Sequence, residues 1–228
     1  LRRRFGAALA ALGADDSVKV VIITGAGEKA FTAGVDLKEL ETAPLTADEL
    51  GPDGPVNTAF RALGKPTIAA VNGFAITGGM ELAINCDILV ASTSARFADT
   101  HARLGIVPGW GMSQILPRLI GPVRARYMSF TGNFIDAATA KAWGLVLDVL
   151  PPAELLPYCW KLAAEIASCD QATLADVRRL INGGLETTLE AGLALEGRLS
   201  KAATQRMDRA RFAATREAVM SRGKEQSG

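Results

Sequence analysis

The chain has 228 residues, of which 49% are hydrophobic and 21% are charged. A chain of this length can bury a substantial core without a stabilising metal or disulfide framework, and one large domain with a smaller appendage fits it best. Its 25 basic and 24 acidic residues give a formal net charge of +1, which indicates neither a nucleic-acid surface nor an acidic partner.

The N-terminal part begins with a helix pattern and continues with a strand pattern. Residues Leu1–Leu12 have a basic start and a short apolar stretch, as a secretory signal does, but they run within a few residues into the strand-like Val18–Thr24. An amphipathic first helix therefore explains them better. The strand ends in Gly25-Ala26-Gly27, a short helix is expected over Asp36–Glu41, and a loop rich in Pro and Gly is expected over 42–55.

The middle of the chain alternates strands and helices. A continuous apolar run predicts a buried strand over Thr67–Val71, and a helix is expected from about Gly79. Another strand is predicted over Ile88–Ala91, and the glycine-rich loop Gly105–Gly111 leads into a helix over Met112–Ile120. Repeated strand-then-helix units favour an α/β protein.

After about Pro152 the pattern becomes all-helical. Apolar residues recur at spacings of three and four, with no strand signal between them, over 154–168, 172–182, 189–203 and 209–222. We therefore predict two parts: a core over 1–152, which holds the site, and a helical region over 153–228. Amphipathic helices of such an appendage bury their apolar stripes against a core or a second subunit, so self-association is expected.

Glu81 stands out because it is a carboxylate inside an apolar stretch that runs from Gly73 to Asp87. An ionised carboxylate removed from water is costly unless it is paired or hydrogen-bonded, so such a residue usually has a task. It follows Gly78 and Gly79 at a strand-to-helix turn, where a ligand can approach the backbone closely. The alternative is a buried glutamate that backbone donors satisfy.

The cysteines and the apolar runs indicate the class of protein. Cys86, Cys159 and Cys169 do not stand at metal-ligand spacings, so we expect reduced thiols, no metal site and a cytoplasmic protein. No apolar run approaches the roughly 20 residues that span a bilayer, so no membrane segment is expected.

Three segments, in this order along the chain, resemble the crotonase superfamily, the enoyl-CoA hydratase and isomerase group. They are Val20–Gly25 with Ala30–Leu37, Lys65–Asp87, and Phe97–Gly111. Any one of them alone is a weak signal, but their joint occurrence at family-like spacing is specific. The resemblance covers the chain to about Pro152 and is looser beyond. The hairpin that precedes the first helix in this family has no counterpart here, and we expect that the residues forming it are missing from the chain.

The resemblance implies a spiral of repeated ββα units with an α-helical C-terminal region that builds trimers or hexamers. It also implies an acyl-CoA thioester as the substrate. Negative charge collects on the thioester oxygen as an enolate during such reactions, and two backbone N–H groups aimed at that oxygen stabilise it. By resemblance, these donors belong to Val35 and Gly78. Turn formation and close packing are the alternative reasons for the glycines around them.

The resemblance further implies which residues surround the substrate. Those near coenzyme A or the acyl group are Ala33, Asp36, Leu37, Gly79, Gly109 and Trp110. Trp110 alternatively packs in the core.

The resemblance gives Glu81 the role of one of two carboxylates around the attacking water. Burial and a raised pKa would let it act as a general base near neutral pH. The position of the second carboxylate is occupied by His101, which is the only histidine in the chain. An imidazole can deliver a proton to the α carbon, so a Glu and His pair can still hydrate a double bond. A structural, hydrogen-bonding histidine is the alternative, and Asp99 and Arg103 flank it in either case.

Hydration of a 2-enoyl-CoA is the function that we expect. Double-bond isomerisation and thioester hydrolysis would use the same oxyanion site, and a non-catalytic acyl-CoA binding protein is the alternative of a different class. No cofactor beyond the coenzyme A of the substrate is expected. Gly25-Ala26-Gly27 follows a strand, but no third glycine at the required spacing opens a helix, so nicotinamide binding is not indicated.

Overall fold

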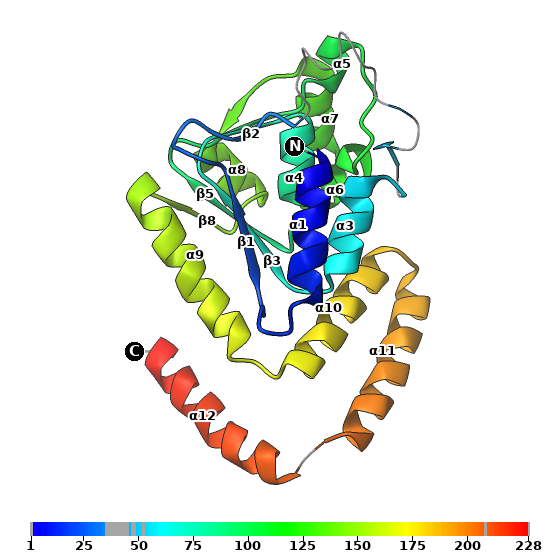
Figure 1. Cartoon of the computed structure of the whole chain (residues 1–228), viewed down its shortest axis with the longest axis vertical. Helices are drawn as coiled ribbons and strands as arrows, with labels where there is room; N and C mark the ends of the chain where they lie inside the picture. Colours follow the sequence, from blue (N-terminus) through cyan, green and yellow to red (C-terminus); the bar gives the residue numbers. More distant parts are fainter. Residues whose placement is uncertain (1, 35–45, 47–48, 52, 208, 228) are drawn as a thin grey trace. The chain divides into compact units, whose positions relative to one another are not determined.

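The computed structural model describes residues 2–34, 46, 49–51, 53–207 and 209–227 of the chain (Figure 1). The chain divides into two compact units, Leu1–Cys169 and Asp170–Gly228. The short helix predicted over Asp36–Glu41 lies outside the described residues.

The first unit contains two four-stranded sheets. One has the strand order β1-β3-β5-β8 and is parallel throughout; the other has the order β2-β4-β6-β7, with β7 antiparallel to β6. The strands are β1 (Val21–Thr24), β2 (Ala30–Thr32), β3 (Thr67–Val71), β4 (Phe74–Ile76), β5 (Ile88–Ser92), β6 (Arg96–Ala98), β7 (Ile135–Asp136) and β8 (Asp148–Leu150).

The two sheets grow together as the chain advances. Each turn lays one strand in the first sheet, the next strand in the second sheet, and then a helix. The register pairs Ile23 with Ala69 and Ala69 with Leu89, so each new turn lies beside the previous one. This arrangement is the α/β spiral of ββα units that the sequence predicted, and the prediction is confirmed.

Helices cover the sheets on both sides. Those of the first unit are α1 (Arg2–Ala14), α3 (Pro55–Leu63), α4 (Gly78–Ile84), α5 (His101–Leu104), α6 (Met112–Ile120), α7 (Pro122–Thr131), α8 (Ala137–Trp143) and α9 (Pro152–Ala167). Helices α1 and α3 pack side by side, and the rings of Phe5 and Phe60 meet with their centroids 5.6 Å apart.

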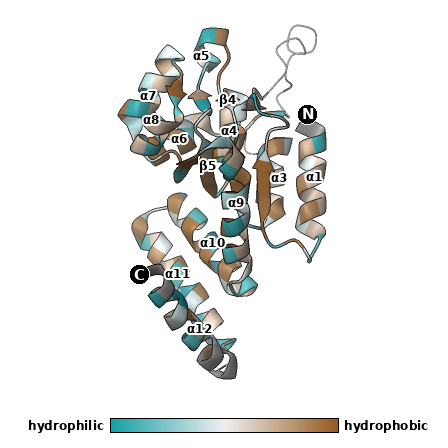
Figure 2. Ribbon diagram, turned by 90° about the vertical axis from the view of Figure 1, so that its left-hand side faces the viewer, coloured by the Kyte–Doolittle hydropathy of each residue, from teal (hydrophilic) through white to brown (hydrophobic). Residues whose placement is uncertain are grey.

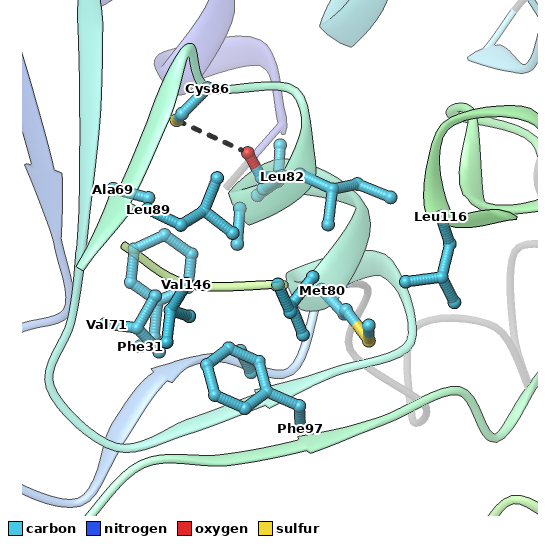
Figure 3. Packing of buried hydrophobic residues seen from close by; sticks show 14 of the residues in the cluster. Phe31, Ala69, Val71, Met80, Leu82, Cys86, Leu89, Phe97, Leu116 and Val146 are labelled. Atoms are coloured by element: carbon cyan, nitrogen blue, oxygen red, sulfur yellow. Dashed lines mark hydrogen bonds between the residues drawn. The ribbon is translucent and has the colours of Figure 1, made fainter. Parts of the chain in front are cut away.

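The hydrophobic core follows from the two-residue period of β3. Successive side chains of a strand point to opposite faces of its sheet. Ala69 and Val71 therefore face the main core, which also holds Met80 and Phe97 (Figure 3), whereas Ile68 and Ala70 face the other way. On that second face they pack against buried side chains of α9, namely Leu155, Cys159 and Ala163. The sheet is thus buried on both faces, as parallel sheets generally are.

The position of α9 bears on the division of the chain. The helix packs on all four strands of the first sheet and belongs to the first compact unit. The predicted core ends at residue 152, where α9 begins, whereas the first compact unit ends after this helix, at Cys169. The two boundaries therefore differ by α9. Figure 2 shows hydrophobic residues along the strands of the first unit, while the helices of the second unit carry both kinds of residue.

The second unit consists of α10 (Gln171–Leu185), α11 (Leu189–Gln205) and α12 (Arg209–Ser227). Side chains cap the first two: Asp170 accepts from the N–H of Thr173, and Thr188 accepts from the N–H of Ala191. Such caps satisfy donors that the first turn of a helix leaves unpaired. No helix among the described residues is long and apolar enough to cross a membrane. The three cysteines are free thiols.

Candidate active site

A cavity that opens to solvent lies in the first unit, where α4 and α5 begin. Most of its wall is apolar, and its polar groups come from a few residues at the ends of β4 and β6. The lining residues are Ala33, Leu50, Ile76, Thr77, Gly78, Glu81, Thr100, His101, Leu104, Ile106, Val107, Gly109 and Trp110. An apolar cavity with a few convergent polar groups is typical of a small-molecule site.

Two glycine-containing bends meet at the wall of this cavity. Gly34 follows β2 with a φ of +83°, and a Cβ on it would lie 2.6 Å from the Cα of Gly78. A Cβ on Gly79 would lie closer still to its neighbour, 1.8 Å from the carbonyl oxygen of Thr32. Only glycine permits these approaches. The end of β2 and the start of α4 are therefore in direct backbone contact.

The predicted oxyanion donors belong to these two bends. Gly78 is the first residue of α4, so its N–H is among the donors that the helix itself leaves unpaired. Val35 directly follows Gly34 in sequence but lies outside the described residues, as do Asp36 and Leu37. The contact between Gly34 and Gly78 brings the two bends together, which is the arrangement that a paired oxyanion site requires.

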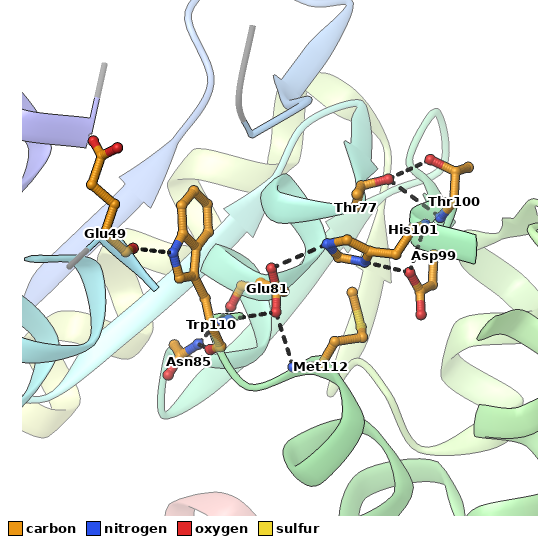
Figure 4. A network of polar contacts seen from close by, with 9 residues as sticks. All are labelled: Glu49, Thr77, Glu81, Asn85, Asp99, Thr100, His101, Trp110 and Met112. Carbon is orange, nitrogen blue, oxygen red and sulfur yellow. Dashed lines mark hydrogen bonds and ion pairs between the residues drawn. The ribbon is translucent and has the colours of Figure 1, made fainter. Parts of the chain in front are cut away.

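Glu81 is buried, with an exposed fraction of 2%. Its Oε1 accepts hydrogen bonds from the backbone N–H groups of Trp110 at 2.8 Å and of Met112 at 3.1 Å. Its Oε2 faces the other way, toward Nε2 of His101 at 3.5 Å (Figure 4). Burial raises the pKa of Glu81, and the two backbone donors together with His101 offset only part of that rise. Glu81 is thus a buried carboxylate whose pKa lies above its ordinary value.

His101 lies between two carboxylates. Its Nδ1 is 2.7 Å from Oδ1 of Asp99, and its backbone N–H donates to the same oxygen at 3.2 Å. Because the Asp99 carboxylate can only accept while ionised, Nδ1 carries a hydrogen and the remaining nitrogen, Nε2, faces Glu81. Burial opposes ionisation of Asp99, but the hydrogen bonds from the ring and the backbone N–H of His101 favour the ionised form, and the pKa of that carboxyl is lowered.

The contact between Glu81 and His101 allows the two side chains to share a proton. A neutral imidazole protonated on Nδ1 presents a lone pair at Nε2, and an ionised Glu81 would present a second acceptor to it. One proton between Oε2 and Nε2 turns this conflict into an attraction. A single proton that can reside on either residue would make the pair an acid and base couple.

Trp110 both packs in the core and lines the cavity, so the two alternatives for it are true together. Its ring N–H donates to the carbonyl oxygen of Glu49 at 3.1 Å. Asn85, one turn after Glu81, donates to the carbonyl oxygens of both Glu81 and Trp110 at 2.8 Å. These bonds fix the loop whose N–H groups hold Oε1 of Glu81.

The structure gathers most of the predicted site residues around one cavity. Those that line it are Ala33, Gly78, Glu81, His101, Gly109 and Trp110, whereas Gly79 lies behind the wall, against Thr32. Sequence reasoning missed Asn85, Thr77 and Thr100. For Asn85 a signal existed, because it is a polar residue four positions after Glu81 in an otherwise apolar helix.

The comparisons with known proteins agree on one family. The family described as enoyl-CoA hydratase/isomerase matches residues 1–222. A probable peroxisomal enoyl-CoA hydratase 1 of Arabidopsis thaliana is 40% identical over 212 residues, covering 93% of this chain and 79% of that protein. A crotonyl-CoA hydratase of Syntrophomonas wolfei is 40% identical over 191 residues, covering 83% and 74%.

Solved structures agree with these relatives. An enoyl-CoA hydratase from Bacillus anthracis superposes with a TM-score of 0.84 at 35% identity, covering 95% of this chain and 85% of that one. An enoyl-CoA hydratase from Mycobacterium tuberculosis gives a TM-score of 0.74 at 44% identity, covering 89% and 86%.

Proposed function

Because the chain belongs to the enoyl-CoA hydratase/isomerase family, we propose that Glu81 and His101 add water across the double bond of a 2-enoyl-CoA held in the cavity. Relatives about 40% identical to this chain are named as hydratases of enoyl-CoA or crotonyl-CoA, and they support an enzyme of the hydratase type. The observation that carries the proposal is the contact of Glu81 Oε2 with His101 Nε2 at 3.5 Å inside the cavity.

The backbone supplies stabilisation of the enolate. Water adding to the β carbon drives negative charge onto the thioester oxygen, and the N–H groups of Gly78 and Val35 receive it. A donor of this kind contributes on the order of 3–4 kcal/mol to barrier lowering. The close approach of Gly34 to Gly78 supports this assignment, because it places the bend that precedes Val35 against the start of α4.

The two side chains supply the proton transfers. With the shared proton on Nε2 of His101, the ionised Glu81 takes a proton from water as the water oxygen bonds to the β carbon. His101 then gives its proton to the α carbon of the enolate. Glu81 is left protonated and His101 neutral, and their direct contact lets the proton return to Nε2. Asp99 holds the ring in the orientation and tautomer that this cycle needs.

Two incubations, one with crotonyl-CoA and one with a 3-enoyl-CoA, separate the reactions that the family fold can host. With crotonyl-CoA, hydration removes the enoyl absorbance and adds the mass of one water to the intact thioester. Hydrolysis would release a free thiol, and isomerase activity would appear with a 3-enoyl-CoA as conversion without added mass. We expect hydration to dominate. If the thioester binds and none of these products forms, the chain is an acyl-CoA binding protein instead.

We also propose that the chain assembles as a homotrimer or hexamer, with no cofactor other than the coenzyme A of its substrate. Large apolar side chains of the second unit are exposed in the single chain, among them Leu185, Leu189 and Leu193. Burial of such residues between subunits would be favourable. Light scattering after gel filtration tests the assembly. The cytoplasmic location stays a prediction; names of relatives include a peroxisomal and a mitochondrial protein.

A further inference from the structure

Thr77 occupies a backbone conformation that suits glycine. Its φ is 55° and its ψ is −116°, and among the described residues it is the one non-glycine with a positive φ. A β-branched residue is strained there. Strain of this kind persists where the surroundings hold the residue in place and where the side chain has a use that glycine could not serve.

Four hydrogen bonds hold Thr77. Its N–H donates to the carbonyl oxygen of Ala98 at 2.9 Å, and its carbonyl accepts from the N–H of Glu81 at 3.0 Å. A glycine would keep both of these. The other two need the hydroxyl: Oγ1 is 2.5 Å from Oγ1 of Thr100, and it accepts from the N–H of Thr100 at 3.3 Å. What threonine adds at this position is therefore a hydroxyl joined to a second hydroxyl at the cavity wall (Figure 4).

The two hydroxyls of this pair carry one hydrogen more than the hydrogen bond between them uses. Two hydroxyls carry two hydrogens, and one of them lies between Oγ1 of Thr77 and Oγ1 of Thr100. The second has no acceptor within hydrogen-bond reach among the described residues, whichever of the two oxygens carries it. A donor facing an apolar cavity without an acceptor is unfavourable once a ligand excludes water. A ligand that brings an acceptor removes that cost.

The place of the pair limits what the acceptor can be. Thr77 precedes Gly78, whose N–H is assigned to the thioester oxygen, and Thr100 precedes His101, which is assigned to the α carbon. The hydroxyl pair thus stands beside the reacting end of the acyl group, and the thioester oxygen already has its own donors. Apart from the water that reacts beside Glu81, the remaining source of an acceptor is an oxygen carried by the acyl chain.

We propose that the Thr77–Thr100 hydroxyl pair determines specificity for an acyl group that bears a hydroxyl, keto or ether oxygen a few bonds beyond the thioester. The inference rests on the proposed function, since it names the acyl class that the same cavity takes. An acyl chain without oxygen leaves the spare hydrogen unpaired, and the site therefore discriminates against it.

Binding of saturated analogues tests the proposal without requiring turnover. Titration calorimetry compares butanoyl-CoA with 4-hydroxybutanoyl-CoA, and we expect the wild type to bind the hydroxylated thioester about tenfold more tightly. The double variant Thr77→Val/Thr100→Val keeps the branched shape and removes both hydroxyls, so its preference should fall to within about twofold. Thr204→Val removes a threonine hydroxyl on exposed α11, which bonds only within its own helix, and should keep the wild-type preference.

The outcomes separate this proposal from the proposed reaction. Equal affinity of the wild type for the two analogues overturns the proposal, even if crotonyl-CoA is hydrated. An equal loss of affinity for both analogues in the double variant also overturns it, because the pair would then only support the turn before Gly78. A preserved preference in a protein that hydrates no enoyl-CoA overturns the reaction alone. Should the double variant fail to fold, Thr77→Gly/Thr100→Val relieves the strained φ and tests the same donor.

Discussion

Replacing Glu81 with glutamine should lower the activity of the protein and raise the stability of its fold at neutral pH. The amide has nearly the shape of the carboxylate, and its Oε1 can still accept from the N–H groups of Trp110 and Met112. Its Nε2 can donate to Nε2 of His101, whose other ring nitrogen is held by Asp99. The variant therefore keeps the contacts of the site and loses only the group that takes a proton from water.

The expected loss of activity equals the contribution that a general base makes to the rate. Such groups contribute about 10²- to 10⁴-fold to rate, so kcat for crotonyl-CoA should fall by that factor, or about 3–5 kcal/mol of transition-state stabilisation. The affinity for a saturated acyl-CoA should change little, because in the proposed complex the thioester oxygen bonds to backbone N–H groups and not to Glu81. A kcat above one tenth of the wild-type value would refute the assignment of Glu81 as the base.

The fold should become more stable at neutral pH. Burial raises the pKa of Glu81 above its ordinary value of 4.5, so the folded state retains the proton longer than the unfolded state does. The free energy of unfolding of the wild type therefore falls as the pH rises from 4.5 through the folded-state pKa, and this loss is complete above it. Glutamine carries no such cost. A gain on the order of 1 kcal/mol, or about 2–4 °C in Tm, is expected at neutral pH.

Urea unfolding near pH 4 and near pH 7 measures this difference. The gain of Glu81→Gln over the wild type should be larger at the higher pH. Glu196→Gln, which changes an exposed carboxylate on α11, is the matched control and should show no gain at either pH. A variant that is less stable than the wild type at neutral pH would show that the ionised form of Glu81 is well compensated in the fold, and the reasoning from burial would fail.

Three further predictions concern the same cavity. Asp99→Asn keeps one acceptor oxygen but removes the negative charge beside Nδ1 of His101, and it should lower kcat about 100-fold with a small change in KM. A parallel rise in KM would indicate a disturbed pocket. The acid limb of kcat/KM should lie above pH 4.5, because Glu81 must lose its proton at a raised pKa, and a pH profile between 4 and 8 checks this. Gly34→Ala places a Cβ 2.6 Å from the Cα of Gly78 at a positive φ. Hydration should therefore be lost, and thermal unfolding should show a destabilisation of about 1–3 kcal/mol. Near-normal activity would refute the contact between the two bends.

The sequence predicts best the elements whose signals are local. The strand Thr67–Val71 and the helix Met112–Ile120 are found with the predicted bounds. The first is a continuous apolar run before a turn at Asn72-Gly73, and the second follows a glycine-rich loop. The three-residue strands β2, β4 and β6 carry too little pattern to be recognised. They become strands because each pairs with its neighbour in the second sheet.

The site shows the same division between local and long-range signals. Glu81 could be singled out because a charge in an apolar run is visible in the sequence itself. The pairing of Thr77 with Thr100 could not, since the two residues are 23 positions apart. They meet because the register of β4 on β6 places Ile76 beside Ala98, so the residues that follow the two strands emerge together at the cavity. Any prediction of that pair would have needed the register first.

The buried carboxylate of Asp99 explains why a histidine suits position 101. Residues Glu81 and Asp99 are both buried carboxylates, with exposed fractions of 2% and 1%. A third carboxylate in place of His101 would lie against Asp99, and burial of several like charges without compensation is strongly unfavourable. An imidazole instead donates to Asp99 and faces Glu81 without adding a negative charge. Residues 99 and 101 therefore act as one unit, in which the imidazole compensates the buried carboxylate beside it.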